Sequence, residues 1–379
     1  MKLLDFNALS ENIEKIADYD LENNNVFGSS YFVYQKGNLT YKKHFGYTGL
    51  NKEQEVDDRT IFRLASMTKP ITAFAMMVLI DKGLVSLDTK AKDFVPELSK
   101  IHVITPEGED LGEVVSDVTI KHLLTHTSGI VSLKPLSLSE DEKASLKASV
   151  NGFLKNGLDF EPFTRAAYSG VAAFNIAALI IEKVSGMSYP DFIKKEIFTP
   201  LGMVDTAFIP TSEQESRIIT MHVKIDEKNA VGKTYPGCIF GDYPWTHPLG
   251  GAGLFSSLHD YSAFAKMLLA EGETEDGKEL VSKETLRLMK TPLVPQDVMP
   301  QNTYSWGLGV RVITNPDYQI LPVGTFGWSG AYGPHFWIDP ENEVCAVFMK
   351  NSQFDGGAGN KSAVRFEQAV FDSFKPTGA

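Results

Sequence analysis

Ser66 and Lys69 lie three residues apart at the expected start of a helix, a spacing that could support nucleophilic catalysis. The apolar residues that follow recur at helical intervals as far as Gly83, which supplies a C-terminal stop. Pro70 fits this helix because it falls in the first turn, where a missing N–H costs little. Lys69 is therefore expected one turn beyond Ser66, on the same face of the helix.

A free serine hydroxyl is a weak nucleophile and needs an adjacent base, which a lysine can provide once its pKa of about 10.4 is lowered. Positive potential at a helix N-terminus acts in that direction, and the free N–H groups there can stabilise an oxyanion. The same spacing also occurs by chance in many chains, as an N-cap serine followed by a solvated lysine. Ser66 and Lys69 alone leave both interpretations open.

The composition limits the possible classes of function. The 379-residue chain has a net charge of −12 and a pI near 5.2, which argues against binding to nucleic acid or to anionic membrane surfaces. It has two cysteines, Cys238 and Cys345, so we expect neither a disulfide framework nor a cysteine metal site. The eight histidines lack metal-binding spacings, and we expect no metal and no cofactor.

The first residues predict an amphipathic helix and not a signal peptide, because Glu11, Glu14 and Asp18 interrupt the apolar positions. Apolar runs along the chain all fall short of the ~18 residues that a transmembrane helix needs. The sequence therefore predicts a cytoplasmic location, unless an export signal has been removed.

Hydrophobic periodicity and turn residues predict strands at both ends of the chain and helices between them. The expected helices occupy residues 4–20, 66–83, 171–184, 189–198, 257–270, 282–290 and 361–374. The expected strands occupy residues 30–35, 39–47, 306–313, 319–326, 335–338 and 344–350. This order predicts an α/β domain formed by residues 1–85 and 300–379, with a mainly helical domain, residues 86–299, inserted between them.

Several other segments have a structural interpretation. Residues 101–117 are expected to form a loop or a small hairpin, and the charged, weakly helical residues 132–157 suggest a mobile flap over a site. His126 is expected to tie down a turn and His335 to lie on a strand. The glycines of residues 250–253 lack the following Lys-Ser/Thr of a phosphate loop, so we expect them to allow close backbone packing.

Two further stretches, Tyr168-Ser169-Gly170 and Gly-Trp-Ser-Gly-Ala at residues 327–331, follow Ser66-x-x-Lys69 in an order that resembles the penicillin-recognising serine hydrolases. This superfamily includes the class C β-lactamases and the D-alanyl-D-alanine carboxypeptidases. Other stretches that look like its landmarks are residues 62–69, 123–129, 200–203 and 304–309. The resemblance covers nearly the whole chain. It implies the β-lactamase/penicillin-binding-protein-like fold, of α/β (α+β) class, with an antiparallel sheet flanked by helices and a mainly helical lobe.

The resemblance also implies a role for each matching residue. Ser66 would be the acylated nucleophile, and Lys69 would take or relay its proton. Tyr168 would be the second acid/base, its phenol pKa drawn down from about 10 by the Lys69 ammonium. The structural alternative for Tyr168 is a buried aromatic with one satisfied hydroxyl. The backbone N–H groups of Ser66 and Ala331 would form the oxyanion hole.

Two positions depart from the family pattern. Gly170 replaces an asparagine that binds a substrate amide, and Trp328 replaces the lysine or histidine that opens the third motif. Trp328 cannot offer a cation to a substrate carboxylate, an interaction worth roughly 1.5–3 kcal/mol, and instead provides a flat apolar wall. The expected substrate-binding residues are Trp328, Ser329, Gly330 and Gly170.

A tryptophan at this position, followed by residues 330–340, looks like the β-lactamase-fold esterases called family VIII carboxylesterases, and like related acyltransferases. We therefore expect a carboxylesterase or acyl-transferring esterase that acts on a small-molecule ester or amide. A β-lactamase or a D-alanyl-D-alanine carboxypeptidase is the alternative, which Gly170 and Trp328 disfavour. A catalytically silent binding or sensor protein is disfavoured because Ser66, Lys69 and Tyr168 are all present.

Overall fold

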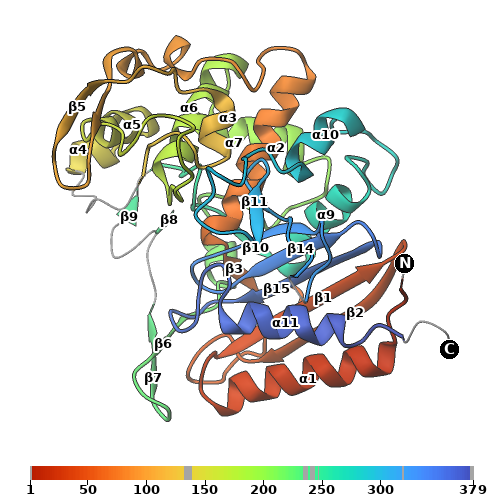
Figure 1. Cartoon of the computed structure of the whole chain (residues 1–379). Helices are drawn as coiled ribbons and strands as arrows, with labels where there is room; N and C mark the ends of the chain where they lie inside the picture. The colour runs from red at the N-terminus through yellow and green to blue at the C-terminus, as the bar shows by residue number, and fades with distance from the viewer. Residues whose placement is uncertain are drawn as a thin grey trace.

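The computed structural model describes residues 2–131, 139–233, 238–239, 244–245, 247–317 and 320–375. Its centre is a seven-stranded antiparallel sheet in the order β11-β12-β13-β14-β15-β1-β2 (Figure 1). The strands are β1 (Gly28–Gln35), β2 (Asn38–Gly46), β11 (Tyr304–Trp306), β12 (Arg311–Ile313), β13 (Phe326–Ser329), β14 (His335–Asp339) and β15 (Val344–Lys350). Segments from both ends of the chain therefore pair in one sheet, where β15 lies beside β1.

Helices and short strand pairs surround this sheet. The helices are α1 (Phe6–Glu22), α2 (Thr68–Asp81), α3 (Ile120–Leu124), α4 (Glu140–Lys143), α5 (Leu146–Leu154), α6 (Ala172–Ser185), α7 (Tyr189–Ile193), α8 (Ser212–Glu215), α9 (Leu258–Leu269), α10 (Lys283–Lys290) and α11 (Lys361–Phe371). The antiparallel pairs are β3 (Ile61–Arg63) with β10 (Phe255–Ser257), β4 (His102–Ile104) with β5 (Asp110–Glu113), β6 (Met221–Lys224) with β7 (Ala230–Lys233), and β8 (Cys238–Ile239) with β9 (Pro244–Trp245). Shorter turns of helix lie at Ala65–Met67, Ala91–Asp93, Pro96–Lys100 and Lys194–Phe198.

The sheet has a layer of helices on each face. Side chains alternate along each strand, so Trp337 and Phe348 point to one face while Phe336 and Val347 point to the other. On the first face α1 and α11 pack side by side and close a small apolar core (Figure 1). On the second face α9 packs on β14, β15 and β1, within the larger apolar core that continues into the helical lobe.

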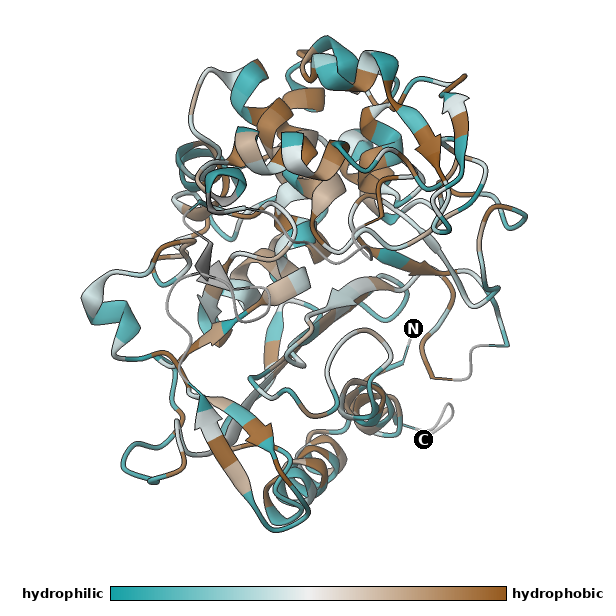
Figure 2. Ribbon diagram, turned by 90° about the vertical axis from the view of Figure 1, so that its left-hand side faces the viewer, coloured by the Kyte–Doolittle hydropathy of each residue, from teal (hydrophilic) through white to brown (hydrophobic). Residues whose placement is uncertain are grey.

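The helical lobe is built around α2 and α6, which pack against each other. Residues 172–181 of α6 are all buried, and its end is set by Gly186, whose φ is +68°. The first twelve residues of α2 are also buried, because this helix lies between the lobe and the sheet. Much of the helical lobe is brown in the hydropathy view of Figure 2, as expected for its helices that form a shared core.

The structure confirms the predicted fold class, and it places most predicted helices and strands within a few residues of their expected bounds. The predicted strand 306–313 is wrong: the chain forms β11 and β12, joined by a turn at Gly307–Val310. Gly309 has a φ of +69°, and a Cβ on Gly307 would lie 1.9 Å from the Met289 carbonyl oxygen, so both glycines serve this turn. The strand predicted at 319–326 is also wrong, because β13 begins only at Phe326. The division into domains at residues 85 and 299 stays a prediction.

The prediction of a flap at residues 132–157 can be compared with the structure for only part of that range. Residues 132–138 lie outside the described residues. α5 is not a flap, because Val150, Phe153 and Leu154 are buried in the main core and the helix packs on α6. Residues 101–117 form the predicted small hairpin, β4 with β5. Within the part of the chain that the structure describes, every helix is too short or too polar to cross a membrane.

Candidate active site

Ser66 lies on a strained turn between β3 and α2. Ala65 has a φ of +45°, a conformation that costs free energy for a residue with a Cβ and must be held by its surroundings. Asn351 holds the strand that leads into this turn: its Oδ1 accepts from the Arg63 N–H at 2.8 Å, and its Nδ2 donates to the Arg63 carbonyl at 3.0 Å. On the other side Gly330 packs so closely that a Cβ would lie 2.2 Å from the Leu64 carbonyl oxygen. The turn is therefore fixed against the end of β13.

Lys69 reaches Ser66 from the first turn of α2. Its Nζ lies 3.3 Å from Ser66 Oγ, 2.6 Å from the Gly170 carbonyl oxygen and 2.8 Å from the Gly251 carbonyl oxygen. The side chain is completely buried, and this desolvation lowers the pKa of Lys69 well below its usual value. A neutral amine has two N–H groups and one lone pair. In that neutral form, with both N–H groups given to the two carbonyls, the lone pair would face Ser66 Oγ.

Tyr168 completes the group around Ser66. Its hydroxyl is hydrogen-bonded to Ser66 and accepts from Trp328 Nε1 at 3.3 Å. Burial raises the pKa of Tyr168 to about 12, with the two hydrogen bonds opposing the rise. The expectation that a Lys69 ammonium lowers this pKa is therefore wrong for the resting site, where burial favours the neutral form of both groups.

His126 holds the segment that carries Tyr168. Its Nδ1 accepts from the Ser169 N–H at 3.0 Å, and its carbonyl accepts from the Ala167 N–H at 2.9 Å. Its ring lies 4.6 Å from the Tyr168 ring and 4.4 Å from the Trp306 ring, measured between centroids. His126 lies in a turn, as predicted, and these contacts join that turn to the extended segment that carries Tyr168, the proposed acid/base. No local pattern indicates the contact between His126 and Tyr168, because they are 42 positions apart in the sequence.

Trp328 lies on β13, and its ring packs against the rings of Tyr168 and Trp306, at centroid distances of 5.3 Å and 4.8 Å. Ser329, the next residue, is 2% exposed and its hydroxyl is bonded to His335 Nδ1 at 2.7 Å, on the sheet face covered by α11. The Ser329 hydroxyl is therefore bonded on the opposite side of the strand from Trp328. The predicted role of Ser329 in substrate binding did not include this bond. His335 lies on β14, as expected.

The predicted roles of Gly170 and Gly330 in substrate binding, and of Ala331 in the oxyanion hole, stay predictions. β12 pairs with β13 only at Phe326 and Gly327, so beyond this point the chain leads through Gly330 to Ala331 along a strand edge that β12 does not cover. The Gly170 carbonyl binds Lys69, a structural contact that the motif comparison did not suggest. In the described ranges, groups of three histidine, cysteine or acidic side chains able to hold a metal ion are absent.

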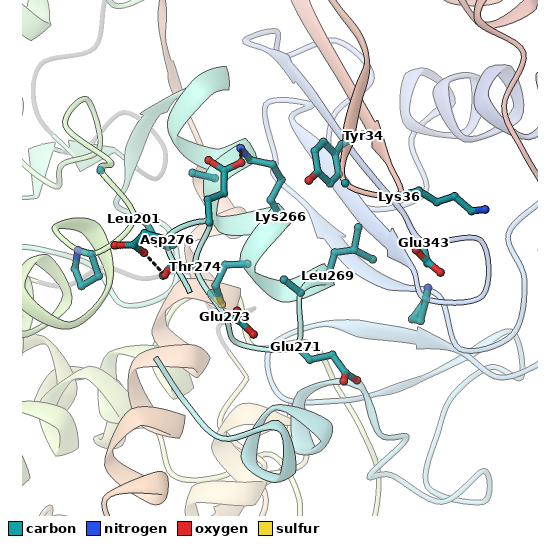
Figure 3. A pocket seen from close by; sticks show the side chains of 18 of the residues that line it. Tyr34, Lys36, Leu201, Lys266, Leu269, Glu271, Glu273, Thr274, Asp276 and Glu343 are labelled. Atoms are coloured by element: carbon teal, nitrogen blue, oxygen red, sulfur yellow. Dashed lines mark hydrogen bonds and ion pairs between the residues drawn. The ribbon is translucent and has the colours of Figure 1, made fainter. Parts of the chain in front are cut away.

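Two surface hollows lie away from this site. One, of about 930 Å³, lies between the end of α9, the β1–β2 turn and residues 271–276, and its walls carry Lys266, Glu271 and Glu343 (Figure 3). Another, of about 570 Å³, lies beside α7 and residues 203–209. Neither hollow is lined by Ser66, Lys69 or Tyr168.

Comparison with known proteins identifies the family of this chain. The family model described as Beta-lactamase matches residues 13–369. The chain belongs to the beta-lactamase family. This confirms the resemblance that the motifs had indicated, and with it a hydrolase of the β-lactamase fold.

Individual relatives cover nearly the whole chain. An uncharacterized protein of Mycobacterium tuberculosis is 28% identical, over 91% of this chain and 89% of its own. Esterase EstB of Burkholderia gladioli is 24% identical, over 94% of each chain. The solved structure of EstCE1, described as a hydrolase with promiscuous acyltransferase activity, superposes with a TM-score of 0.81 at 20% identity, over 97% of this chain and 99% of its own. This last similarity shows the shared fold.

Proposed function

We propose that the protein is a serine esterase, or an acyl-transferring esterase, that works through an acyl-enzyme on Ser66. The observation that carries the proposal is the position of Lys69 Nζ, 3.3 Å from Ser66 Oγ with both of its N–H groups given to backbone carbonyls. Ser66 thereby gains the adjacent base that a serine nucleophile requires. The esterase names of EstB and EstCE1 support the same reaction class.

In the acylation step, Ser66 Oγ attacks the ester carbonyl carbon while its proton passes to the Lys69 amine. The carbonyl oxygen becomes an oxyanion, which we assign to the backbone N–H groups of Ser66 and Ala331. When the tetrahedral intermediate collapses, the bond to the leaving alkoxide breaks and the neutral Tyr168 hydroxyl protonates it.

Proton transfer also explains how a tyrosine with a pKa of about 12 can act as an acid and later as a base. Once Lys69 holds the serine proton it is an ammonium, and its Nζ lies 4.9 Å from the centre of the Tyr168 ring. A cation at that distance stabilises the phenolate, so Tyr168 gives up its proton more easily only after Ser66 has attacked. The phenolate then accepts a proton from the water or alcohol that attacks the acyl-enzyme. When the bond between the acyl carbon and Ser66 Oγ breaks, the Lys69 ammonium returns its proton to Oγ, and the resting site is restored.

Trp328 supports neutral esters over carboxylate-bearing substrates. Its indole N–H is bonded to Tyr168 and only 5% of the residue is exposed, so it presents an apolar wall without a charge. A charged hydrogen bond worth roughly 1.5–3 kcal/mol is missing for a β-lactam or D-alanine carboxylate. Cleavage of β-lactams or D-alanyl peptides is therefore the second candidate, which Trp328 disfavours together with Gly170.

A paired assay tests the proposal. Purified protein and its Ser66→Ala variant are compared on p-nitrophenyl acetate, p-nitrophenyl butyrate and a chromogenic cephalosporin. We expect ester turnover well above cephalosporin turnover, and its loss in Ser66→Ala with the thermal midpoint retained. Substantial ester turnover by Ser66→Ala would reject the assignment. Failure of the wild type to react with any acylating probe would favour the silent binding protein.

A further inference from the structure

The Gly251 carbonyl that binds Lys69 belongs to a segment held by three buried side chains from three helices. The neighbouring Gly250 donates its N–H to Asn175 Oδ1 of α6 at 2.9 Å. The Gly250 carbonyl accepts from Thr72 Oγ of α2 at 2.6 Å, and Thr72 Oγ lies 2.6 Å from the Tyr189 hydroxyl of α7. Asn175, Thr72 and Tyr189 are all completely buried. Both polar groups of the Gly250 backbone are therefore fixed by buried side chains.

The hydroxyl chain has a defined direction. Thr72 has one hydroxyl proton, and the Gly250 carbonyl at 2.6 Å is a nearer acceptor than the Thr68 carbonyl at 3.2 Å. Tyr189 then donates to Thr72 Oγ, which accepts one hydrogen bond while donating the other. A donor that also accepts polarises its own O–H bond, so the tyrosine strengthens the hold of Thr72 on Gly250.

Close packing removes the freedom that the glycines would otherwise give this segment. A Cβ on Gly250 would lie 2.2 Å from the Phe174 carbonyl oxygen, and a Cβ on Gly251 would lie 2.9 Å from the Gly170 carbonyl oxygen. The Gly251 segment thus rests directly on the start of α6 and on the second carbonyl that binds Lys69. The Gly170 and Gly251 carbonyls, which both accept from Lys69, are therefore held in place by packing against each other and against the helices.

We propose that Thr72, Tyr189 and Asn175 are positioning residues for Lys69, which aim the Gly251 carbonyl so that the lysine lone pair faces Ser66. This inference rests on the proposed function, because it assigns Lys69 the role of base. The inference goes beyond that function because it assigns the orientation of Lys69 to three side chains that lie outside the sequence motifs. If the Gly251 carbonyl is no longer held in this orientation, acylation of Ser66 should become slower and the proton affinity of Lys69 should change.

The sign of the second effect follows from the carbonyl dipole. An oxygen aimed at Nζ stabilises the ammonium more than the neutral amine, because hydrogen bonds to charged groups are the stronger ones. A Gly251 carbonyl that is no longer held lowers the apparent pKa of Lys69. The acid limb of Ser66 acylation should then move to lower pH, by about half to one pH unit.

The test measures the rate at which a fluorophosphonate probe labels Ser66 in the full chain, as a function of pH. Thr72→Val removes the donor to Gly250 at nearly constant volume, and Thr72→Ser keeps it. Thr206→Val is the matched control, since Thr206 is also buried and also makes two side-chain hydrogen bonds, to Ser256 and Asp260. We expect Thr72→Val to label about tenfold more slowly or worse, with the acid limb shifted downward, and Thr72→Ser to restore both. Thr206→Val should lower the thermal midpoint and leave the acid limb in place.

An unshifted acid limb in folded Thr72→Val, or the same shift in Thr206→Val, would overturn the proposal while the serine mechanism stood. If Thr72→Val does not fold, Tyr189→Phe removes the hydroxyl that donates to Thr72, and the same downward shift is expected on a smaller scale. An unchanged profile in that variant is equally contradictory. A wild type that the probe does not label, or labels at a residue other than Ser66, would reject the proposed function itself and this inference with it.

Discussion

Trp328→Lys should restore the cation that the family's third motif usually offers, and its effect can be estimated from the structure. The indole N–H already lies 3.3 Å from the Tyr168 hydroxyl, so a lysine amine built on the same strand position can reach this side of the site. A charged hydrogen bond to a substrate carboxylate is worth roughly 1.5–3 kcal/mol. At 1.36 kcal/mol per factor of ten, cephalosporin turnover should gain about 10- to 150-fold relative to ester turnover.

Trp328→Lys also removes the packing contacts of the indole ring. Trp328 is 5% exposed and its ring contacts Tyr168 and Trp306, so a smaller side chain leaves a partly filled cavity. We expect the free energy of unfolding to fall by about 2–4 kcal/mol. This loss acts on the folded state that both substrates share, so it lowers the amount of active protein without changing the ratio of the two turnovers.

The assay is therefore a ratio: kcat/KM for a chromogenic cephalosporin divided by kcat/KM for p-nitrophenyl butyrate, in the wild type, Trp328→Lys and Trp328→Met. The methionine variant loses the indole without adding a charge, and its ratio should stay within about threefold of the wild type. A lysine variant that folds and hydrolyses the ester with an unchanged ratio would refute the role given to Trp328.

Three other predictions follow from the geometry. Gly330→Ala should reduce ester turnover by about a hundredfold, measured as kcat/KM, because the added Cβ meets the Leu64 carbonyl oxygen at 2.2 Å and displaces the Ser66 turn. Glu367→Gln should lower the free energy of unfolding in urea by about 3 kcal/mol, because it removes the buried carboxylate that pairs with Arg311. Wild-type kcat/KM should rise with pH through the lowered pKa of Lys69 and stay high well below pH 10, because the amine is active only when deprotonated.

Each of these predictions has a result that contradicts it. Full turnover in Gly330→Ala would mean that the contact with Leu64 yields easily and does not fix the Ser66 turn. A Glu367→Gln protein as stable as the wild type would show that the buried carboxylate is not needed beside Arg311. Gln368→Ala, at the next and only partly buried position of α11, is the control. A rate that falls with rising pH from 6 to 9 would exclude a neutral Lys69 as the base.

The sequence allowed the side chains that gather around Ser66 to be predicted, because each lies in a short local motif. Ser66 and Lys69 are one helical turn apart, and the structure brings Tyr168 and Trp328 to them, as the motif order implied. The expected strands 30–35 and 39–47 correspond to β1 and β2, and Lys36 and Gly37 between them take the positive φ values that a two-residue hairpin turn needs.

The supports of the site could not be predicted in the same way. The side chain of Asn351 bonds the backbone of Arg63, 288 positions away, and no local pattern records such a pairing. The carbonyls of Gly170 and Gly251 carry no side-chain identity at all, so their contacts with Lys69 depend only on how loops pack. The rise in the pKa of Tyr168 has the same origin, because burial is a property of the assembled core.

Intact-protein mass spectrometry of an acyl-enzyme tests the central claim most directly. The protein is mixed with p-nitrophenyl acetate, quenched in acid within the first turnovers and digested to locate the adduct. The mechanism predicts one added acetyl group on Ser66, absent from Ser66→Ala. Rapid ester turnover with no adduct on Ser66, or with the acetyl group on another residue, would contradict it.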